Sequence, residues 1–412
     1  MKKLTALLLL VFYLTISNST LAQTPARLQK TAIGGDLYNF ENYKSFDEYA
    51  LKYRSYITKM RPNLNADEVA NLAPLTLRKT NKSCQKTIGI LLIHGLGDSP
   101  FLMSDLAKTI ADNQSCITLK SLILPGNGLT AGASLEVSDK NWQEAVNFAI
   151  ADFQNEKVNG IVAIGFSTGG ALVLNQVLNH NKDIIAAAFF SPAFDIGISK
   201  IQVIGLKAID FISNFKPLNF LAYQAKHDDV NIYKYESFSY RGINNLYKII
   251  QINNQLLAQN KIINIPTFFA FSDVDSTVKS ATTIALINNN FTNAQGIIFS
   301  NDGVKIKPEI TTLKPINLTK KIIDLSHGSI PISGANYFYG HKAKTNYGCL
   351  KYDTKTTQDE FISCKNFDKK FYYGETTKYN MATYKDLSRI TYNPDYKAVA
   401  TKLNGFINQL KK

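Results

Sequence analysis

Cysteine and tryptophan are rare in this sequence of 412 residues, which has four of the first and one of the second. No CxxC or HxxxH spacing occurs, so the cysteines match no zinc motif. No apolar run is as long as a comfortable membrane span, and the longest covers residues 4–16. Acidic residues are outnumbered, 32 against 46 lysines and arginines, which gives a net charge of +14. The basic residues form no run interleaved with aromatics, which argues against nucleic-acid binding.

The first residues have the pattern of an export signal. Lys2 and Lys3 precede the apolar run 4–16, and Thr20-Leu21-Ala22 supplies small residues at the −3 and −1 positions of a cleavage site. No cysteine follows the run, so nothing indicates a lipid anchor. We expect residues 1–22 to be removed and the protein to be exported, to the periplasm or the extracellular space. In that setting four cysteines favour two disulfides.

The pattern of polar and apolar residues divides the remaining chain into an N-terminal extension, 23–83, and a large domain, 84–412. The extension is polar, with one amphipathic helix predicted near 46–60. In the domain, short apolar runs alternate with helical patterns, which predicts an α/β fold with a mostly parallel sheet covered by helices. The predicted strands are 88–93, 117–124, 161–164, 184–190, 267–271 and 321–325. The predicted helices are 103–111, 141–153, 170–178 and 395–410.

Two stretches interrupt this alternation. Residues 195–263 have amphipathic helical patterns without a buried strand, which predicts a helical cap inserted after one strand. Residues 331–386 are rich in Tyr, Lys and Thr and contain Cys349 and Cys364. We interpret this second stretch as an irregular insertion held by a disulfide.

The pentapeptide Gly165-Phe166-Ser167-Thr168-Gly169 matches G-x-S-x-G, between a predicted strand and a predicted helix. In this motif the serine lies on a strained turn, whose flanking positions leave no room for side chains. The turn raises the hydroxyl at the start of a helix, where the positive end of the helix dipole favours a developing negative charge. The motif predicts that Ser167 is a nucleophile.

Five segments of the chain carry recognisable motifs: His94-Gly95, Leu124-Pro125-Gly126-Asn127-Gly128, Gly165 to Gly170, Asp275-Ser276-Thr277-Val278 and Ser326-His327-Gly328. Together, and in this order, they resemble the segments of α/β-hydrolase-fold serine hydrolases. The resemblance is to bacterial carboxylesterases, monoacylglycerol-lipase-like enzymes and serine aminopeptidase-like hydrolases, and covers residues 84–195 and 261–330 with the final helix. It implies the α/β-hydrolase fold and hydrolysis without a metal or organic cofactor. One departure is Asn127, where histidine is usual in a position that is not catalytic.

The resemblance implies a triad in the order Ser, Asp, His. His327 follows the predicted strand 321–325, where the family carries its histidine. The other candidates, His180, His227 and His341, are expected to be exposed. For the acid, Asp275 fits the family pattern best, and Asp273 and Asp195 are the alternatives. Because Asp275 and His327 are far apart in sequence, we expect the polar stretch 301–318 to loop out.

The loop after His94-Gly95 resembles an oxyanion loop, which supplies one of two backbone N–H groups for a tetrahedral intermediate. By position these groups belong to Leu96 and Thr168. His94 itself is interpreted as structural, with its ring turned into the loop.

In this fold the strands after Cys84 and Cys116 are parallel neighbours, and both cysteines precede their strands at similar offsets. We therefore expect the disulfides Cys84–Cys116 and Cys349–Cys364. Four free, buried thiols are the alternative.

Three functions are compatible with the sequence. The first is cleavage of carboxylic esters, either short to medium acyl esters or monoacyl lipids, with a transient contact to a membrane surface. The second is a peptidase or amidase of the serine aminopeptidase-like type. The third is a non-catalytic binding protein on the same scaffold. An acyl-binding roof would favour the first, and simple packing onto the core is the alternative role of the apolar cap residues Ile201, Val203, Ile204, Leu206, Ile209, Phe211 and Ile212.

Overall fold

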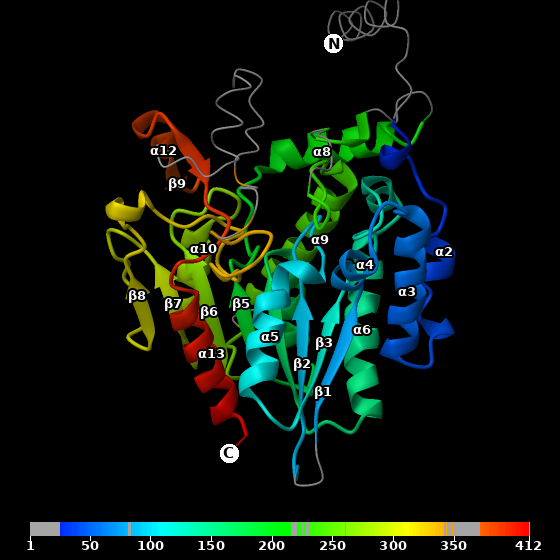
Figure 1. Ribbon diagram of the computed structural model, residues 1–412, viewed down its shortest axis with the longest axis horizontal. Helices are drawn as coiled ribbons and strands as arrows, with labels where there is room; N and C mark the ends of the chain where they lie inside the picture. The colour runs from blue at the N-terminus through cyan, green and yellow to red at the C-terminus, as the bar shows by residue number, and fades with distance from the viewer. Residues whose placement is uncertain are drawn as a thin grey trace, which may run out of the picture.

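A sheet of eight strands forms the centre of the protein in a computed structural model (Figure 1). The structure describes residues 25–80, 84–215, 221–224, 226, 231–259, 261–341, 343, 348 and 371–411. The strand order is β1-β3-β2-β4-β5-β6-β7-β8, and every pairing is parallel except β1 with β3. The strands are β1 (Leu75–Lys79), β2 (Ile88–Ile93), β3 (Ile117–Leu122), β4 (Ile161–Phe166), β5 (Ile184–Phe190), β6 (Thr267–Ser272), β7 (Ala294–Phe299) and β8 (Ile310–Leu313).

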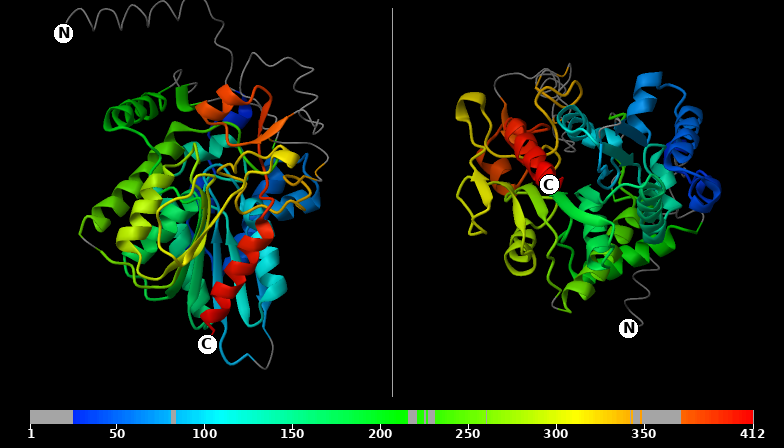
Figure 2. Two further views of the ribbon diagram at one scale, coloured as in Figure 1. Left: turned by 90° about the vertical axis from the view of Figure 1, so that its left-hand side faces the viewer. Right: turned by 90° about the horizontal axis from the view of Figure 1, so that it is seen from below.

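Helices cover both faces of the sheet, which explains why β2, β3, β4 and β6 are buried along their whole length. Figure 2 shows α5 and α13 side by side on one face, with α7, α9 and α10 on the other. The predicted α/β class and mostly parallel sheet are confirmed. The covering helices are α5 (Ser104–Asn113), α6 (Asp139–Asn155), α7 (Thr168–Leu178), α9 (Tyr240–Leu257), α10 (Ser280–Asn290) and α13 (Tyr396–Gln409).

The N-terminal stretch packs on the same core. Its predicted helix is confirmed as α3 (Phe46–Met60), which buries Phe46, Tyr49, Tyr53 and Ile57 along one side. The hydroxyl of Tyr53 donates to Asn127 O at 2.7 Å. Because β1 also extends the sheet beside β3, residues 34–79 share one sheet and one core with the α/β domain. The other elements here are α2 (Gly34–Leu37) and α4 (Ala66–Leu72), and short 3-10 helices are η1 (Ala26–Leu28), η2 (Phe40–Asn42), η3 (Pro100–Met103), η4 (Ala131–Leu135) and η6 (Leu318–Lys320).

Residues 195–263, for which a helical cap is predicted, follow β5 and contain α8 (Lys200–Ile212) and α9, which also covers one face of the sheet. In Figure 1, α8 lies above the carboxyl ends of the parallel strands, the edge where active sites of open α/β sheets form. In the described part of the chain, no helix is both long and apolar enough to cross a membrane.

Two predictions about the sheet were wrong. Residues 321–325 are not a strand of it; Ile322 makes only isolated bridges, to Asn317 and Tyr373. The stretch 301–318 does not simply loop out, because it contains β8. β8 is a short edge strand with two exposed threonines, Thr311 and Thr312, so its sequence lacks the apolar run of a central strand.

The C-terminal stretch expected to be irregular has some regular structure. β9 (Tyr372–Gly374) and β10 (Leu387–Arg389) form a small parallel sheet, with α12 (Lys378–Thr383) between them. In Figure 1 this segment lies above β7, at the carboxyl end of the main sheet.

The Cys84–Cys116 disulfide is present, with a Cα–Cα distance of 5.4 Å, at the starts of β2 and β3. The predicted Cys349–Cys364 pair lies outside the described residues.

Candidate active site

Ser167 lies on a sharp turn between β4 and α7. Its φ is +50°, a left-handed value that is costly for a residue with a side chain. Its N–H donates to Phe190 O of β5 at 3.0 Å, which holds the turn against the sheet. A Cβ on Gly165 would lie 2.4 Å from the backbone of Gly169. The strained turn therefore requires the small residues that the motif supplies.

Gly169 also brings the turn close to the end of β2. A Cβ there would lie 2.0 Å from Ile93 O, so only glycine allows this approach. The loop that begins at His94 is thus adjacent to the first turn of α7. Thr168 is the first residue of α7, where a backbone N–H has no acceptor within the helix. The structure therefore places Leu96, in the loop, and Thr168 in neighbouring elements.

His94 is held as a structural residue, as interpreted from the sequence. Its Nε2 accepts the N–H of Leu124 at 3.0 Å, so its proton is on Nδ1, which donates to Gly95 O at 2.7 Å. Burial lowers the pKa of His94 to about 4. A neutral imidazole with both nitrogens engaged is not available for proton transfer.

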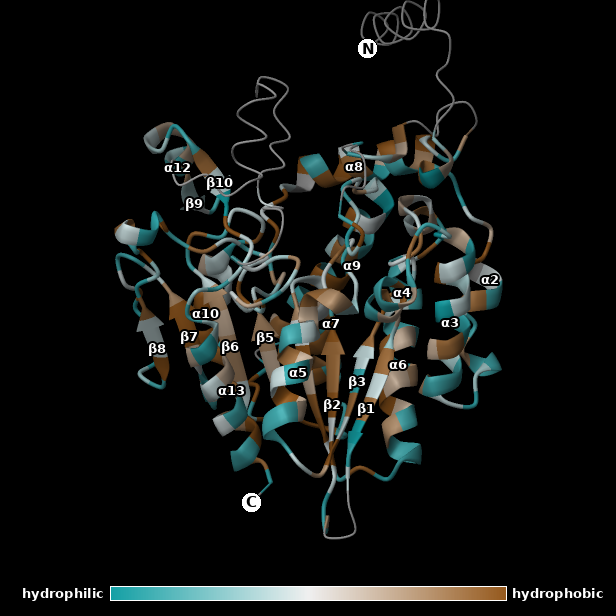
Figure 3. Cartoon of the chain, viewed as in Figure 1, coloured by the Kyte–Doolittle hydropathy of each residue, from teal (hydrophilic) through white to brown (hydrophobic). Residues whose placement is uncertain are grey.

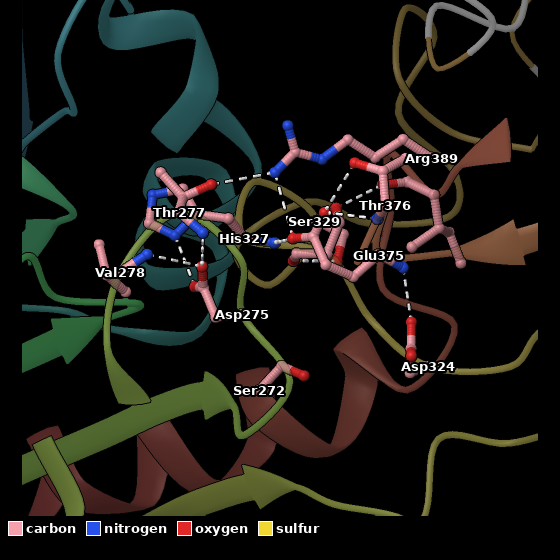
Figure 4. A network of polar contacts seen from close by, with 12 residues as sticks. Ser272, Asp275, Thr277, Val278, Asp324, His327, Ser329, Glu375, Thr376 and Arg389 are labelled. Atoms are coloured by element: carbon pink, nitrogen blue, oxygen red, sulfur yellow. Dashed lines mark hydrogen bonds and ion pairs between the residues drawn. The ribbon is translucent and has the colours of Figure 1, made fainter. Parts of the chain in front are cut away.

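His327 and Asp275 form a short hydrogen bond, with 2.6 Å between Nδ1 and Oδ2 (Figure 4). The other oxygen, Oδ1, accepts the N–H groups of Thr277 at 2.8 Å and Val278 at 3.0 Å. The Asp275 side chain is fully buried, and that of His327 is 9% exposed. The His327 ring lies 5.0 Å from the ring of Phe166, the residue that precedes Ser167. The histidine–aspartate pair therefore lies beside the residue that precedes Ser167.

The rival acids have other roles. Asp195 accepts the N–H of Gly197 and the hydroxyl of Thr282. Asp273 is half-buried, and burial raises the pKa of its carboxyl group. Among the other histidines, His180 and His341 are exposed as expected, and His227 lies outside the described residues.

The structure adds two residues that the sequence did not indicate, Glu375 and Arg389. A carboxylate oxygen of Glu375 accepts the backbone N–H of His327 at 3.0 Å. The Arg389 guanidinium donates to the same oxygen at 3.1 Å and to the hydroxyl of Thr277 at 3.2 Å. No sequence motif contains them, and both lie in or next to the stretch that was interpreted as an insertion.

No metal-binding cluster of three or more His, Cys, Asp or Glu side chains occurs among the described residues. A strained serine beside a histidine–aspartate pair can carry out nucleophilic acyl transfer without one.

The sheet, the turn at Ser167 and the Asp275–His327 pair define a hydrolase of the α/β-hydrolase fold. Residues 85–301 match the family described as serine aminopeptidase, S33, and the chain belongs to that family. The match includes Ser167 and Asp275 and ends before His327.

No curated protein matches the sequence. Among solved structures, one from a study of LipS and LipT, two metagenome-derived lipolytic enzymes, is 20% identical, with a TM-score of 0.43, and covers 55% of this chain and 87% of its own. The monoacylglycerol lipase of Paleococcus ferrophilus is 14% identical over the same shares, also with a TM-score of 0.43. The monoglyceride lipase of Saccharomyces cerevisiae is 13% identical, with a TM-score of 0.41, over 55% of this chain and 81% of its own. Likenesses of this extent say nothing about the substrate.

Proposed function

We propose that the protein is a serine hydrolase that cleaves carboxylic esters through an acyl-enzyme on Ser167. The observation that carries the proposal is the 2.6 Å contact of His327 with the buried Asp275, next to the strained turn of Ser167. A short contact to a buried carboxylate fixes the imidazole with its proton on Nδ1. The Nε2 atom is then free to accept a proton.

The reaction has two halves. Ser167 Oγ attacks the ester carbonyl carbon while His327 Nε2 takes the hydroxyl proton. The N–H groups of Leu96 and Thr168 stabilise the oxyanion. As the C–O bond breaks, His327 returns the proton to the leaving alcohol. Water then attacks the acyl-enzyme in the same way, which releases the carboxylic acid and restores Ser167.

The cap supports an apolar, lipid-like substrate. Val203 of α8 is buried, and Leu206 and Ile209 are half-buried on the same side, as expected for packing or for a roof. Ile201, Ile204 and Phe211 instead face solvent, with 83%, 69% and 67% of each exposed, so they are not part of a roof. Figure 3 shows α8 at the top of the molecule, with hydrophobic and hydrophilic residues alternating along it. An outward apolar helix face of this kind suits contact with a lipid surface that presents the substrate.

The charges near the site favour an ester over a peptide with a free amino terminus. Asp98, buried in the oxyanion loop, interacts electrostatically with His327 and with a second buried acid, Glu236. The positive charges of Lys234 and Arg389 lower the pKa of Asp98, whereas the negative charge of Glu236 raises it. The acidic pair is therefore compensated by positive charge, which would weaken binding of a substrate ammonium group. The serine aminopeptidase name of the family keeps the peptidase as the second candidate.

Activity-based labelling separates the catalytic from the non-catalytic functions. We expect a fluorophosphonate probe to label the wild-type protein and to leave Ser167→Ala unlabelled. Kinetics on p-nitrophenyl esters of increasing chain length, compared with aminoacyl anilides, then distinguish esterase from peptidase. Fast turnover of anilides with slow turnover of esters would establish the peptidase.

The lipid-surface contact has its own test. The double change Ile204→Ser and Phe211→Ser should reduce hydrolysis of an aggregated monoacylglycerol and leave hydrolysis of soluble p-nitrophenyl acetate unchanged. Equal loss on both substrates would show that α8 acts in another way.

We also propose that the protein is exported and that residues 1–22 are removed. The leader pattern and the Cys84–Cys116 disulfide support this, since disulfides persist in oxidising compartments. N-terminal sequencing of the mature protein should begin at Gln23. A protein recovered with Met1 from the cytosol would contradict the proposal.

A further inference from the structure

The carboxylate of Glu375 is the centre of a buried network beside the catalytic pair (Figure 4). Its side chain is fully buried. One oxygen accepts the N–H of His327 at 3.0 Å and a guanidinium N–H of Arg389 at 3.1 Å. The other accepts the N–H of Thr376 at 2.8 Å. Both oxygens of this buried carboxylate therefore accept hydrogen bonds, and one of the donors is a guanidinium group.

The loop that carries His327 depends on the C-terminal segment for its position. Residues 321–325 are not held by the main sheet, and Ile323 N instead donates to Tyr373 O of β9 at 2.9 Å. The hydroxyl of Ser326 donates to Ile390 O at 2.5 Å. Together with the bond from His327 N to Glu375, three successive contacts attach this loop to residues 371–390.

Arg389 connects the same segment to the loop of the acid. Its Nη2 donates both to Glu375 Oε2 and to the hydroxyl of Thr277. Thr277 in turn donates its backbone N–H to Asp275 Oδ1 at 2.8 Å. The contacts form a closed circuit from Asp275 through Thr277, Arg389 and Glu375 to His327, and back through the 2.6 Å bond.

Glu375 is itself fixed by its surroundings. Asp324 Oδ1 accepts the N–H of Glu375 at 2.5 Å. The Asn380 amide donates to Asp324 Oδ2 at 2.7 Å and to Glu375 O at 2.9 Å. A residue held on both sides of its backbone can hold another group in place.

We propose, on the basis of the function given above, that Glu375 and Arg389 are positioning residues that fix the distance between the histidine loop and the acid loop. The segment 371–390, which lies beyond the family match of 85–301, thereby completes the active site. Neither residue touches the reacting atoms; they act through His327 and Asp275.

The test is Glu375→Gln, which keeps the size of the side chain. A glutamine offers one acceptor oxygen, so in either orientation its NH2 group faces a donor, at His327 and Arg389 or at Thr376. We expect kcat on a soluble p-nitrophenyl ester to fall about 10- to 100-fold with KM nearly unchanged, because misplacement by about 1 Å can cost 10²-fold. Fluorophosphonate labelling of Ser167 should slow by a similar factor.

Arg389→Lys provides a second variant that should fold, since Arg389 is 34% exposed. It keeps the charge but replaces the rigid, planar guanidinium, whose Nη2 bridges Glu375 and Thr277, with an ammonium group on a shorter and more flexible side chain. We expect a smaller loss of kcat in the same direction, again without a change in KM.

The matched control is Asp152→Asn, a buried carboxylate paired with Lys120 outside the site. It should lower the melting temperature as much as Glu375→Gln or more, while kcat stays within about twofold, because a distant stability loss does not displace the catalytic loops.

The proposal would be overturned if Glu375→Gln and Arg389→Lys lowered only the melting temperature and kept the wild-type kcat and labelling rate. If Glu375→Gln does not fold, Arg389→Lys decides alone. A wild-type protein that is neither labelled nor active would instead refute the proposed function.

Discussion

Replacing Asp275 with asparagine tests the site where its hydrogen bonds are most constrained. Oδ1 accepts two backbone N–H groups, from Thr277 and Val278, and Oδ2 faces Nδ1 of His327. An asparagine has one acceptor oxygen, and the two N–H groups require it at the Oδ1 position. The NH2 group is then directed at His327. Nδ1 must lose its own proton before it can accept a hydrogen bond from this group.

The consequence is an imidazole with its proton on Nε2, the nitrogen that has to take the proton of Ser167. The base is lost while the serine and the oxyanion groups remain in place. In Ser-His-Asp triads this exchange lowers kcat about 10⁴-fold, or roughly 5 kcal/mol of barrier. Rotating the amide does not restore the base cheaply. The N–H groups of Thr277 and Val278 would then face the amide NH2, and the partly buried one at Val278 would lack an acceptor, at about 1–3 kcal/mol.

The assay compares kcat on a p-nitrophenyl ester for Asp275→Asn, Asp195→Asn and Asp273→Asn, after circular dichroism has shown that each is folded. Asp195 binds Gly197 and Thr282, so its variant should keep most of the activity, as should the Asp273 variant. A folded Asp275→Asn enzyme within tenfold of wild type would refute the tautomer argument. An inactive Asp195→Asn enzyme would move the acid to the loop after β5.

Three further outcomes follow from contacts elsewhere in the fold. Gly169→Ala should lower the melting temperature and abolish labelling, because its Cβ would meet Ile93 O at 2.0 Å, whereas Gly205→Ala, with nothing within 4 Å, should be neutral or stabilising. Because burial lowers the pKa of His94 to about 4, its contribution to stability is present above pH 6.5 and is lost as the pH falls toward 4. The change is about 3 kcal/mol, and urea unfolding at pH 7 and pH 4.5 should show a smaller difference in His94→Gln than in wild type. Replacing Cys84 and Cys116 with serine should cost about 3–4 kcal/mol of unfolding free energy for a sequence separation of 32, and an unchanged urea midpoint would contradict this.

The central strands could be predicted because a strand that is buried on both faces consists of a continuous run of apolar residues. β2 reads Ile-Gly-Ile-Leu-Leu-Ile and β5 reads Ile-Ile-Ala-Ala-Ala-Phe-Phe, with no polar side chain in either. The turn at Ser167 could also be predicted from the sequence, because its geometry permits only glycine at two fixed positions. Each of these features is visible within a few consecutive residues of the sequence.

The edge strand of the sheet could not be predicted, because an exposed strand does not need apolar residues. β8 reads Ile-Thr-Thr-Leu, and its middle residues are exposed, so its pattern does not differ from that of a polar loop. The run 321–325 has the apolar residues of a strand and they are buried, yet the backbone of this run pairs with Tyr373 of β9 instead of with a strand of the main sheet. Apolar character predicted the burial of Ile322, Ile323 and Leu325 and could not predict the partner of their backbone.

Glu375 lies beyond the reach of motif analysis because of the group that it binds. Its partner is the backbone N–H of His327, which every residue other than proline carries, so no residue type at either position signals the contact. The one local trace is Gly374, where a Cβ would lie 2.4 Å from the Ile323 side chain and 2.6 Å from an Asp324 carboxylate oxygen. Only glycine lets β9 come this close to the segment before His327. The same close approach replaces the sheet as the support of that segment, so the failure to predict Glu375 and the wrong prediction of a strand at 321–325 have one physical cause.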